Sequence, residues 1–272
     1  MDQQFDVRFV TLSSGARIRV VECGEGPTIL LLHGIPTSSM LWRSVMPALA
    51  PHARAIAIDL LGYGGSDQPA DFLPTLTHQV EVVTEICEQL QLTDVIVVGH
   101  DIGGGIAQLF CCDHPETVRG LVLIDTIAYD SFPEPGIDRL KDPEWDDRIQ
   151  QIDLSAGLLK GLTKGSTKDS DALSEVAQMY AQPFEGRSGR EAYLRAARAI
   201  RTQDLTDRID DIEAITQPVL IVWGDEDVFQ PKEYGERLAA ALCHGRLHIV
   251  PGGRHFLPED EGQLVAELIL QL

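Results

Sequence analysis

Asp101 is the residue of this sequence with the clearest potential for chemistry. It lies between the β-branched run Val95–Val98, which ends at Gly99, and a run of small and apolar residues that begins at Ile102. The order strand, Gly-x-nucleophile-x-Gly, helix is typical of a nucleophile elbow, a sharp turn that raises a reactive side chain above a sheet edge. The sequence therefore predicts a reactive carboxylate at Asp101, with the N-terminus of the following helix directed at it.

Three further residues with acid or base potential follow predicted strands. Asp125 comes directly after an apolar run, and Asp227 and His255 each lie within five residues of the end of one. Ligands of an open parallel sheet bind beyond the carboxyl ends of its strands, so these side chains are expected near Asp101. The chain order of nucleophile, acid and histidine is that of a catalytic triad. Both Asp125 and Asp227 are candidates for the acid.

A carboxylate nucleophile favours chemistry at saturated carbon. With an unperturbed pKa of about 4, it is ionised without help from a base. Its adduct with an acyl carbon would expel the carboxylate more readily than an alkoxide, whereas attack on carbon bearing a halide or an epoxide oxygen gives a stable alkyl ester. His255 can then deprotonate a water that hydrolyses this ester. The backbone N–H groups of Ile35 and Ile102 are placed to receive the oxyanion on Asp101.

The elements that must position these residues alternate between strand and helix. This alternation predicts an α/β fold with a mostly parallel, doubly wound sheet and right-handed crossovers, preceded by an outer hairpin. Strands are predicted at 5–12, 16–23, 28–33, 53–58, 95–98, 118–124, 218–223 and 246–250, and helices at 41–49, 76–90, 102–113, 232–242 and 259–272.

The alternation stops between residues 129 and 215. This stretch has no β-branched runs and shows helical patterns at 172–180 and 190–200. Apolar residues at helical spacing indicate amphipathic helices rather than strands. The sequence therefore predicts a helical cap domain at 129–215, inserted into a core domain formed by 1–128 and 216–272.

With these motifs in place, the chain resembles the α/β-hydrolase superfamily. The segments His33–Arg43 and Gly99–Asp101 are similar to the aspartate-nucleophile branch, which contains haloalkane and haloacetate dehalogenases and epoxide hydrolases. The resemblance implies Asp101 as nucleophile and His255 as base. It places the acid at Asp227, the usual position, or at Asp125, the alternative of several dehalogenases. Of the two, Asp227 is favoured.

The sequence departs from the dehalogenases at two positions. Haloalkane dehalogenases carry a Trp after the nucleophile and an Asn after the first His-Gly to hold the halide, and haloacetate dehalogenases carry an Arg after the nucleophile. Here Ile102 and Ile35 occupy these positions, and neither side chain donates a hydrogen bond. The two isoleucines suggest an apolar substrate.

Epoxide hydrolases use cap tyrosines to protonate the leaving alkoxide, and this resemblance makes Tyr180 and Tyr193 candidates. Packing is the competing interpretation for tyrosines at helical spacing. Together with Trp145 and His33, they complete the predicted substrate-binding set. His33 and His100 are also expected to support the oxyanion loop by hydrogen bonding.

Composition limits the partners. The formal net charge is −20, from 22 Lys and Arg against 42 Asp and Glu, so nucleic acid and anionic membranes are poor partners. No metal-ligand or phosphate-loop pattern is present among the residues, so neither a metal nor a cofactor is expected. Residues 1–4 do not begin a secretory signal, and no apolar run reaches the ~20 residues of a membrane span. We therefore expect a cytoplasmic protein.

These inferences predict a cofactor-free hydrolase that opens epoxides or cleaves carbon–halogen bonds in a small apolar substrate, with water as the second substrate. One alternative is an esterase or lyase in which Asp101 is a base. Another is a ligand receptor without catalysis. The presence of both Asp101 and His255 argues against the receptor, which needs no water-activating histidine.

Overall fold

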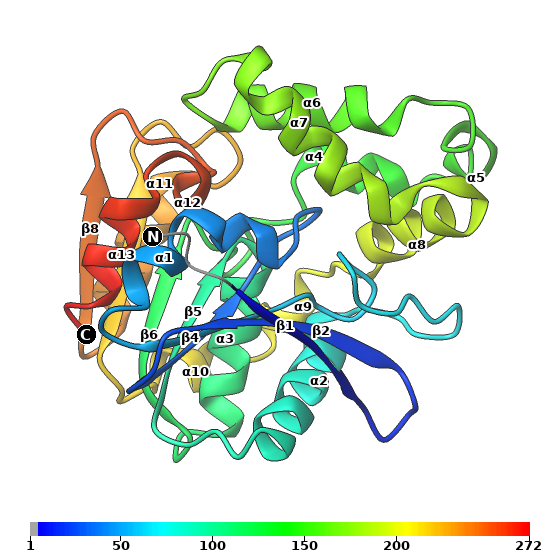
Figure 1. The fold of residues 1–272 in the computed structure, drawn as a ribbon. Helices are drawn as coiled ribbons and strands as arrows, with labels where there is room; N and C mark the ends of the chain where they lie inside the picture. Colours follow the sequence, from blue (N-terminus) through cyan, green and yellow to red (C-terminus); the bar gives the residue numbers. More distant parts are fainter. Residues whose placement is uncertain (1–4) are drawn as a thin grey trace.

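A computed structural model describes residues 5–272, so residues 1–4, on which the expectation about a secretory signal rests, lie outside the described part. Within residues 5–272, eight strands form one sheet in the order β1-β2-β4-β3-β5-β6-β7-β8. β1 and β2 pair antiparallel, β2 pairs antiparallel with β4, and the remaining pairs are parallel (Figure 1). The strands are β1 (Asp6–Thr11), β2 (Arg17–Cys23), β3 (Thr28–Leu32), β4 (Arg54–Ile58), β5 (Val95–His100), β6 (Val118–Ile124), β7 (Val219–Gly224) and β8 (Gly245–Val250).

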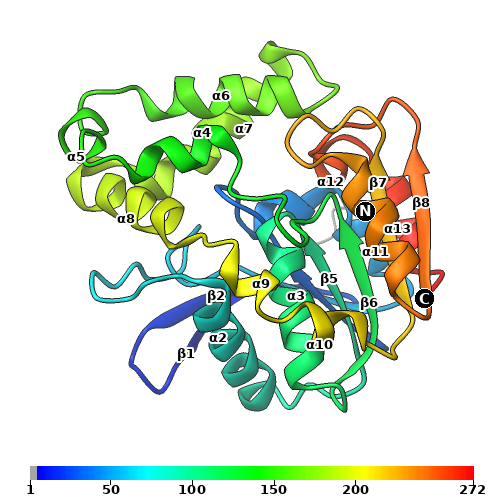
Figure 2. The same cartoon turned by 180° about the vertical axis from the view of Figure 1, so that it is seen from behind.

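Helices cover both faces of the sheet, which is why the central parallel strands are apolar throughout. α1 and α13 pack together on one face, and α2, α3 and α11 cover the other (Figures 1 and 2). The predicted doubly wound α/β fold is confirmed. No helix in residues 5–272 is both long and apolar enough to cross a membrane. These helices are α1 (Met46–Leu49), α2 (Leu76–Gln89), α3 (Ile102–Asp113), α11 (Lys232–Ala241) and α13 (Gly262–Ile269).

Two of the predicted helices are wrong, because each is divided into two separate elements. The helix predicted at 41–49 is divided into a 3₁₀ turn, Ser39–Ser44, and α1, because Pro47 in the first turn of α1 starts a new helix rather than continuing one. The helix predicted at 259–272 is divided into α12 (Leu257–Asp260) and α13, with Glu261 outside helical geometry at φ −124° and ψ 41°.

Between β6 and β7 the chain forms helices and loops only, all within the described residues. Helices α4 to α8, which we call the cap, lie beyond the carboxyl ends of the parallel strands (Figure 1). α9 and α10 then lead the chain back along the core to β7 (Figure 2). These elements are α4 (Pro135–Asp138), α5 (Trp145–Arg148), α6 (Leu154–Gly165), α7 (Ser170–Ala181), α8 (Gly186–Ala199), α9 (Gln203–Thr206) and α10 (Ile209–Glu213).

The turn between β5 and α3 is tight enough to force an unusual backbone at Asp101. This residue has φ 53° and ψ −121°, a conformation that is costly for a residue with a Cβ atom. A Cβ on Gly99 would lie 2.3 Å from the carbonyl oxygen of Gly103, and one on Gly103 would lie 2.2 Å from that of Leu32. Glycine at both positions therefore lets α3 approach the sheet, which presents the Asp101 side chain beyond the sheet edge.

Candidate active site

Asp101 lies in a buried position with backbone amides directed at its carboxylate. The Ile35 N–H donates to Asp101 Oδ1 at 3.0 Å. Burial raises the pKa of Asp101, while His255 and the amides of Ile102 and Ile35 act in the opposite direction by stabilising the anion. The two amides predicted as oxyanion donors therefore both lie at the Asp101 carboxylate.

His255 lies between two carboxylates. Its Nδ1 donates to Asp227 Oδ2 at 2.9 Å, and its Nε2 faces Asp101 Oδ2 at 3.9 Å, which is beyond direct hydrogen-bond distance. Since Nδ1 carries the donated proton, Nε2 holds the free lone pair of the neutral ring. Burial opposes protonation of His255, but Asp227 and Asp101 outweigh it and raise the pKa of His255 above its usual value. The imidazole is thus held with Nε2 toward Asp101.

Asp227, not Asp125, is the carboxylate that reaches His255. Asp227 Oδ1 accepts from the N–H groups of Phe229 and Gln230 at 2.7 and 3.0 Å, which fixes the side chain while Oδ2 binds the imidazole. Asp125 instead accepts from Gly224 N at 2.8 Å and joins the ends of β6 and β7. Its Oδ2 is buried without a hydrogen-bond partner.

The environment of Asp125 disfavours its ionised form. Burial and the charge of nearby Asp227 raise the pKa of Asp125 well above its usual value, and the single amide of Gly224 only partly opposes them. The two acids that the sequence left open thus differ in their surroundings. Asp227 is hydrogen-bonded as an anion, whereas Asp125 is a buried acid with one unpaired oxygen.

The loop that carries Ile35, which we call the oxyanion loop, is held by side chains of the core. His33 Nε2 accepts from Leu60 N at 3.0 Å, so Nδ1 carries the proton and donates to the Gly34 carbonyl at 2.8 Å. Burial lowers the pKa of His33 and keeps the ring neutral. Both ring nitrogens of His33 are therefore occupied by backbone, which supports the expected role in the loop and leaves neither nitrogen for a substrate.

His100 supports a different loop from the one expected. Its Nε2 donates to the carbonyl of His255 at 2.8 Å, so it holds the loop that carries the imidazole and not the oxyanion loop. Burial keeps the pKa of His100 well below its usual value. The rings of Phe229 and Phe256 pack edge-on against His255 at centroid distances of 5.2 and 4.9 Å. Packing and the His100 bond together fix the orientation of His255.

The three predicted cap residues lie in different surroundings. Trp145 packs against the guanidinium groups of Arg139 and Arg148, which lie 5.2 and 4.6 Å from the centre of its ring. It is part of α5, at the end of the cap farthest from β8 (Figures 1 and 2), so the structure does not bring it to His255. Tyr180 is buried with its hydroxyl unpaired, and Tyr193 packs edge-on against Phe184 at 5.3 Å.

Sequence reasoning missed Tyr63. This residue is fully buried and its hydroxyl has no hydrogen-bond partner. Asp101 is among the charges that raise the pKa of Tyr63 after burial itself. A signal was present, because Tyr63 follows β4 in the sequence Gly62-Tyr63-Gly64, beyond the carboxyl end of a parallel strand, where ligands bind.

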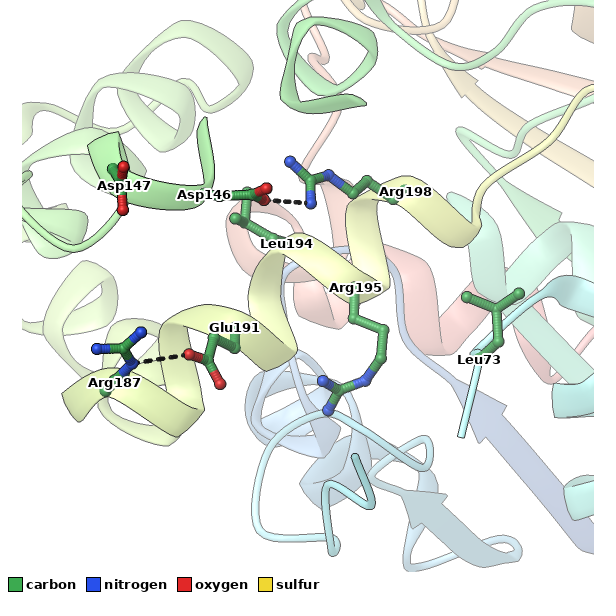
Figure 3. A pocket seen from close by; sticks show the side chains of 8 residues that line it. All are labelled: Leu73, Asp146, Asp147, Arg187, Glu191, Leu194, Arg195 and Arg198. Carbon is green, nitrogen blue, oxygen red and sulfur yellow. Dashed lines mark hydrogen bonds and ion pairs between the residues drawn. The ribbon is translucent and has the colours of Figure 1, made fainter. Parts of the chain in front are cut away.

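A cavity of about 360 Å³ lies between α5, α8 and the core loop that carries Leu73. Figure 3 shows that its walls carry the ion pairs Arg187–Glu191 and Arg198–Asp146, whose charges compensate each other. None of the predicted site residues lines it, and its charged walls do not suit an apolar substrate. Its lining residues are Leu73, Asp146, Asp147, Arg187, Glu191, Leu194, Arg195 and Arg198.

Comparisons with known proteins agree with this architecture. Haloalkane dehalogenase 2 of Mycobacterium tuberculosis (strain ATCC 25618 / H37Rv) is 29% identical over 271 residues, covering 95% of this chain and 92% of the relative. The soluble epoxide hydrolase of Corynebacterium sp. (strain C12) is 29% identical over 276 residues, covering 95% and 94%. The solved structure of the epoxide hydrolase CorEH without ligand has a TM-score of 0.85 at 25% identity, with 98% of both chains covered.

The family model described as the alpha/beta hydrolase fold matches residues 27–262. This range contains the elbow at Asp101, the strand β7 before Asp227, and His255. The predicted resemblance to this fold family is confirmed. The prediction that the protein is a hydrolase is confirmed as well, since its named relatives are hydrolases. The chain belongs to the α/β-hydrolase fold family.

Proposed function

We propose that this protein hydrolyses a small apolar epoxide or organohalide through a covalent alkyl ester on Asp101. In this proposal residues 129–215 are the cap domain over a core domain of 1–128 and 216–272. The observation that carries it is the arrangement of His255, whose Nδ1 binds Asp227 while Nε2 faces Asp101 Oδ2 at 3.9 Å. The named dehalogenase and epoxide hydrolase relatives support the same chemistry.

The two oxygens of Asp101 have different parts in the first step. Oδ1 is held by the Ile35 amide, so Oδ2 is the atom that attacks the carbon of the substrate. The new Oδ2–C bond forms as the carbon–oxygen bond of an epoxide, or the carbon–halogen bond, breaks. The ester carbonyl oxygen is then Oδ1, which stays between the amide donors.

The second step uses His255 as a base. Its free Nε2 removes a proton from water, and the hydroxide attacks the carboxyl carbon of Asp101. The negative charge that develops on Oδ1 is stabilised by the Ile35 and Ile102 amides, which already face the carboxylate. Collapse of this intermediate breaks the bond between the carboxyl carbon and Oδ2, which departs on the product as a hydroxyl group and takes the proton from His255. The oxygen that came from water replaces it in the Asp101 carboxyl group.

The trapped intermediate is the direct test. In a His255→Gln variant, the ester still forms but its hydrolysis loses the base. Incubation with a panel of epoxides and haloalkanes is expected to add the mass of the whole epoxide, or of the haloalkane less its halide, to the intact protein. Proteolysis and mass spectrometry should locate the added mass on the peptide that contains Asp101.

Two controls decide the outcome. His244→Gln changes a histidine on the surface at the start of β8 and should give no adduct, since its turnover is intact. Asp101→Asn in the His255→Gln background should abolish the adduct. If a compound that the unmodified protein converts leaves no mass on the His255→Gln variant, Asp101 is not its nucleophile. Residual turnover by Asp101→Asn alone would favour the reading in which Asp101 is a base.

A further inference from the structure

The Tyr63 hydroxyl is a buried polar group for which the folded chain provides no partner. Tyr63 is 0% exposed, and its oxygen makes no hydrogen bond. Leaving a buried hydroxyl unpaired lowers stability, a cost that Phe would avoid in the same space. The position therefore calls for an explanation outside the packing of the core.

Aromatic contacts place Tyr63 between the oxyanion loop and the cap. On the core side its ring packs edge-on against His33 at 5.5 Å, next to the loop whose Ile35 amide binds Asp101. On the cap side it packs edge-on against Phe184 at 6.3 Å, and Phe184 in turn packs against Tyr193 at 5.3 Å. Tyr63 thus lies where a molecule bound between Asp101 and the cap would be.

The electrostatic surroundings of Tyr63 agree with this placement. After burial, Asp101 and then Tyr193 are the groups that raise its pKa, so both lie near enough to act on the hydroxyl. Burial also raises the pKa of Tyr193 to about 12, with Arg139 acting in the opposite direction. Both phenols therefore keep their protons at neutral pH and are hydrogen-bond donors.

We propose that Tyr63, on the core loop after β4, donates to the leaving oxygen of the substrate opposite the cap residue Tyr193, which assigns the substrate to the epoxides. This inference rests on the proposed function and narrows its substrate class. It also supplies the leaving-group donor that the side chains of Ile35 and Ile102 cannot provide. A halide departs as a stable anion, whereas an epoxide oxygen departs as a strongly basic alkoxide that needs a proton.

The protons balance over one turnover. As Asp101 Oδ2 bonds to the epoxide carbon, the carbon–oxygen bond breaks and the Tyr63 proton passes to the leaving oxygen, which gives a hydroxyalkyl ester and a tyrosinate. In hydrolysis, the proton that His255 takes from water goes to the departing diol oxygen. The second proton of that water, left on the new Asp101 carboxyl group, returns to Tyr63.

The test measures ester formation alone, in the His255→Gln background, by intact mass against time. Two terminal epoxides of similar size are used: ethyloxirane, and (trifluoromethyl)oxirane, whose alkoxide is much less basic. Tyr63→Phe should slow alkylation by ethyloxirane by about 10²-fold, the usual effect of losing a positioned acid, and by (trifluoromethyl)oxirane far less. The thermal midpoint of Tyr63→Phe should stay equal or rise, because the unpaired hydroxyl is removed.

Tyr234→Phe is the matched control, since Tyr234 lies on α11 with its hydroxyl 3.3 Å from Asp130. It should leave both rates unchanged. Equal slowing of the two epoxides by Tyr63→Phe, or no slowing, would overturn the role of Tyr63 while the adduct itself still supports Asp101. A parent variant that forms no adduct with either epoxide would instead overturn the proposed epoxide chemistry before Tyr63 is in question.

Discussion

Asp125 and Asp227 show how far surroundings decide the role of a residue. Both follow a parallel strand, and both were open as the acid on sequence grounds. Asp227 accepts from two amides and from the imidazole of His255, whereas Asp125 accepts from one amide and leaves one buried oxygen unpaired. Only the first arrangement stabilises a carboxylate that can hold a protonated histidine.

We therefore expect replacement by asparagine to lower turnover strongly at Asp227 and only slightly at Asp125. Asp227→Asn should lower turnover by about 10³–10⁴-fold, since an amide favours the wrong imidazole tautomer. Asp125→Asn should change turnover less than about threefold, because the amide can still accept from Gly224. Steady-state rates of the two variants on one substrate provide the measurement. The reverse pattern would assign the acid to Asp125.

The same Asp125→Asn variant should also be more stable at neutral pH, by about 1–3 kcal/mol. The pKa of Asp125 is raised in the folded state, so the protonated acid favours folding at low pH, and this contribution is lost as the pH rises through the raised pKa. Asparagine has no such dependence. The difference in the free energy of urea unfolding between Asp125→Asn and the unmodified protein should therefore vanish near pH 4 and grow as the pH rises.

Residue identity was enough to propose Asp101 and His255 as site residues, but it did not predict every hydrogen-bond partner. Asp101 and His255 could be named because glycines and strand ends surround them in the sequence. The bond from His100 to the His255 carbonyl spans 155 positions, and no local pattern encodes it. Tyr63 was within reach of the strand-end argument, yet its unpaired hydroxyl becomes visible only once the ring is packed.

At the scale of elements, the elbow depends on close contact between α3 and β3. The ideal Cβ of Gly103 would lie 2.2 Å from the Leu32 carbonyl oxygen and 2.5 Å from that of His33. Both neighbours are backbone atoms of the sheet and the oxyanion loop, so they cannot move aside as a flexible side chain can. The contact couples the helix that follows Asp101 to the loop that binds it.

Gly103→Ala should therefore lower the free energy of unfolding by about 1–3 kcal/mol. Gly161→Ala is the matched control, because Gly161 lies in the interior of α6 with no other atom within 4 Å of its Cβ position. It should raise stability by up to about 1 kcal/mol through helix propensity. The urea midpoints of the two variants measure these changes, provided that the dependence of the unfolding free energy on urea concentration is the same. Equal shifts of the two midpoints would contradict the close contact at Gly103.

Elements with strong local signals were predicted well, and those shaped by distant contacts were not. The strand at 118–124 and the helix at 102–113 have the predicted limits, because apolar periodicity and glycines mark them. The break at Glu261 has no comparable signal. It separates α12, whose Glu259 and Asp260 side chains are bound to Arg43 and to Ser166, from α13, whose apolar face packs on α1.

At the scale of the whole molecule, negative charge dominates. With 42 acidic against 22 basic side chains, most long-range charge interactions on the surface are repulsive and oppose compact structure. The ion pair of Arg43 with Glu259 joins two core elements and has a carboxylate that is only 1% exposed. Buried pairs of this kind are little affected by dissolved ions.

Sodium chloride should accordingly raise the thermal midpoint of this protein. Between about 0.01 M and about 0.1 M salt the Debye length falls from roughly 30 Å to roughly 10 Å, which screens the surface repulsion but not the buried pair. Differential scanning calorimetry in chloride, without sulfate, measures the shift. A falling midpoint would mean that exposed ion pairs outweigh the repulsion.

The turn between α6 and α7 is bound to the segment that carries the proposed base. Arg254 donates to the Ser166 carbonyl at 3.0 Å, Phe256 N donates to the Gly165 carbonyl at 2.9 Å, and Lys168 donates to the Glu259 carbonyl at 2.6 Å. The cap and the His255 loop therefore form one structural unit, although 87 residues separate Lys168 from His255 in the sequence.

This connection has a consequence for recombination between relatives. In a chimera that exchanges only residues 129–215, the incoming turn would have to form these contacts with residues 254–260 again. The transferable module is the cap together with residues 254–260. We therefore expect exchanges of the cap to preserve these contacts best when both segments come from the same relative.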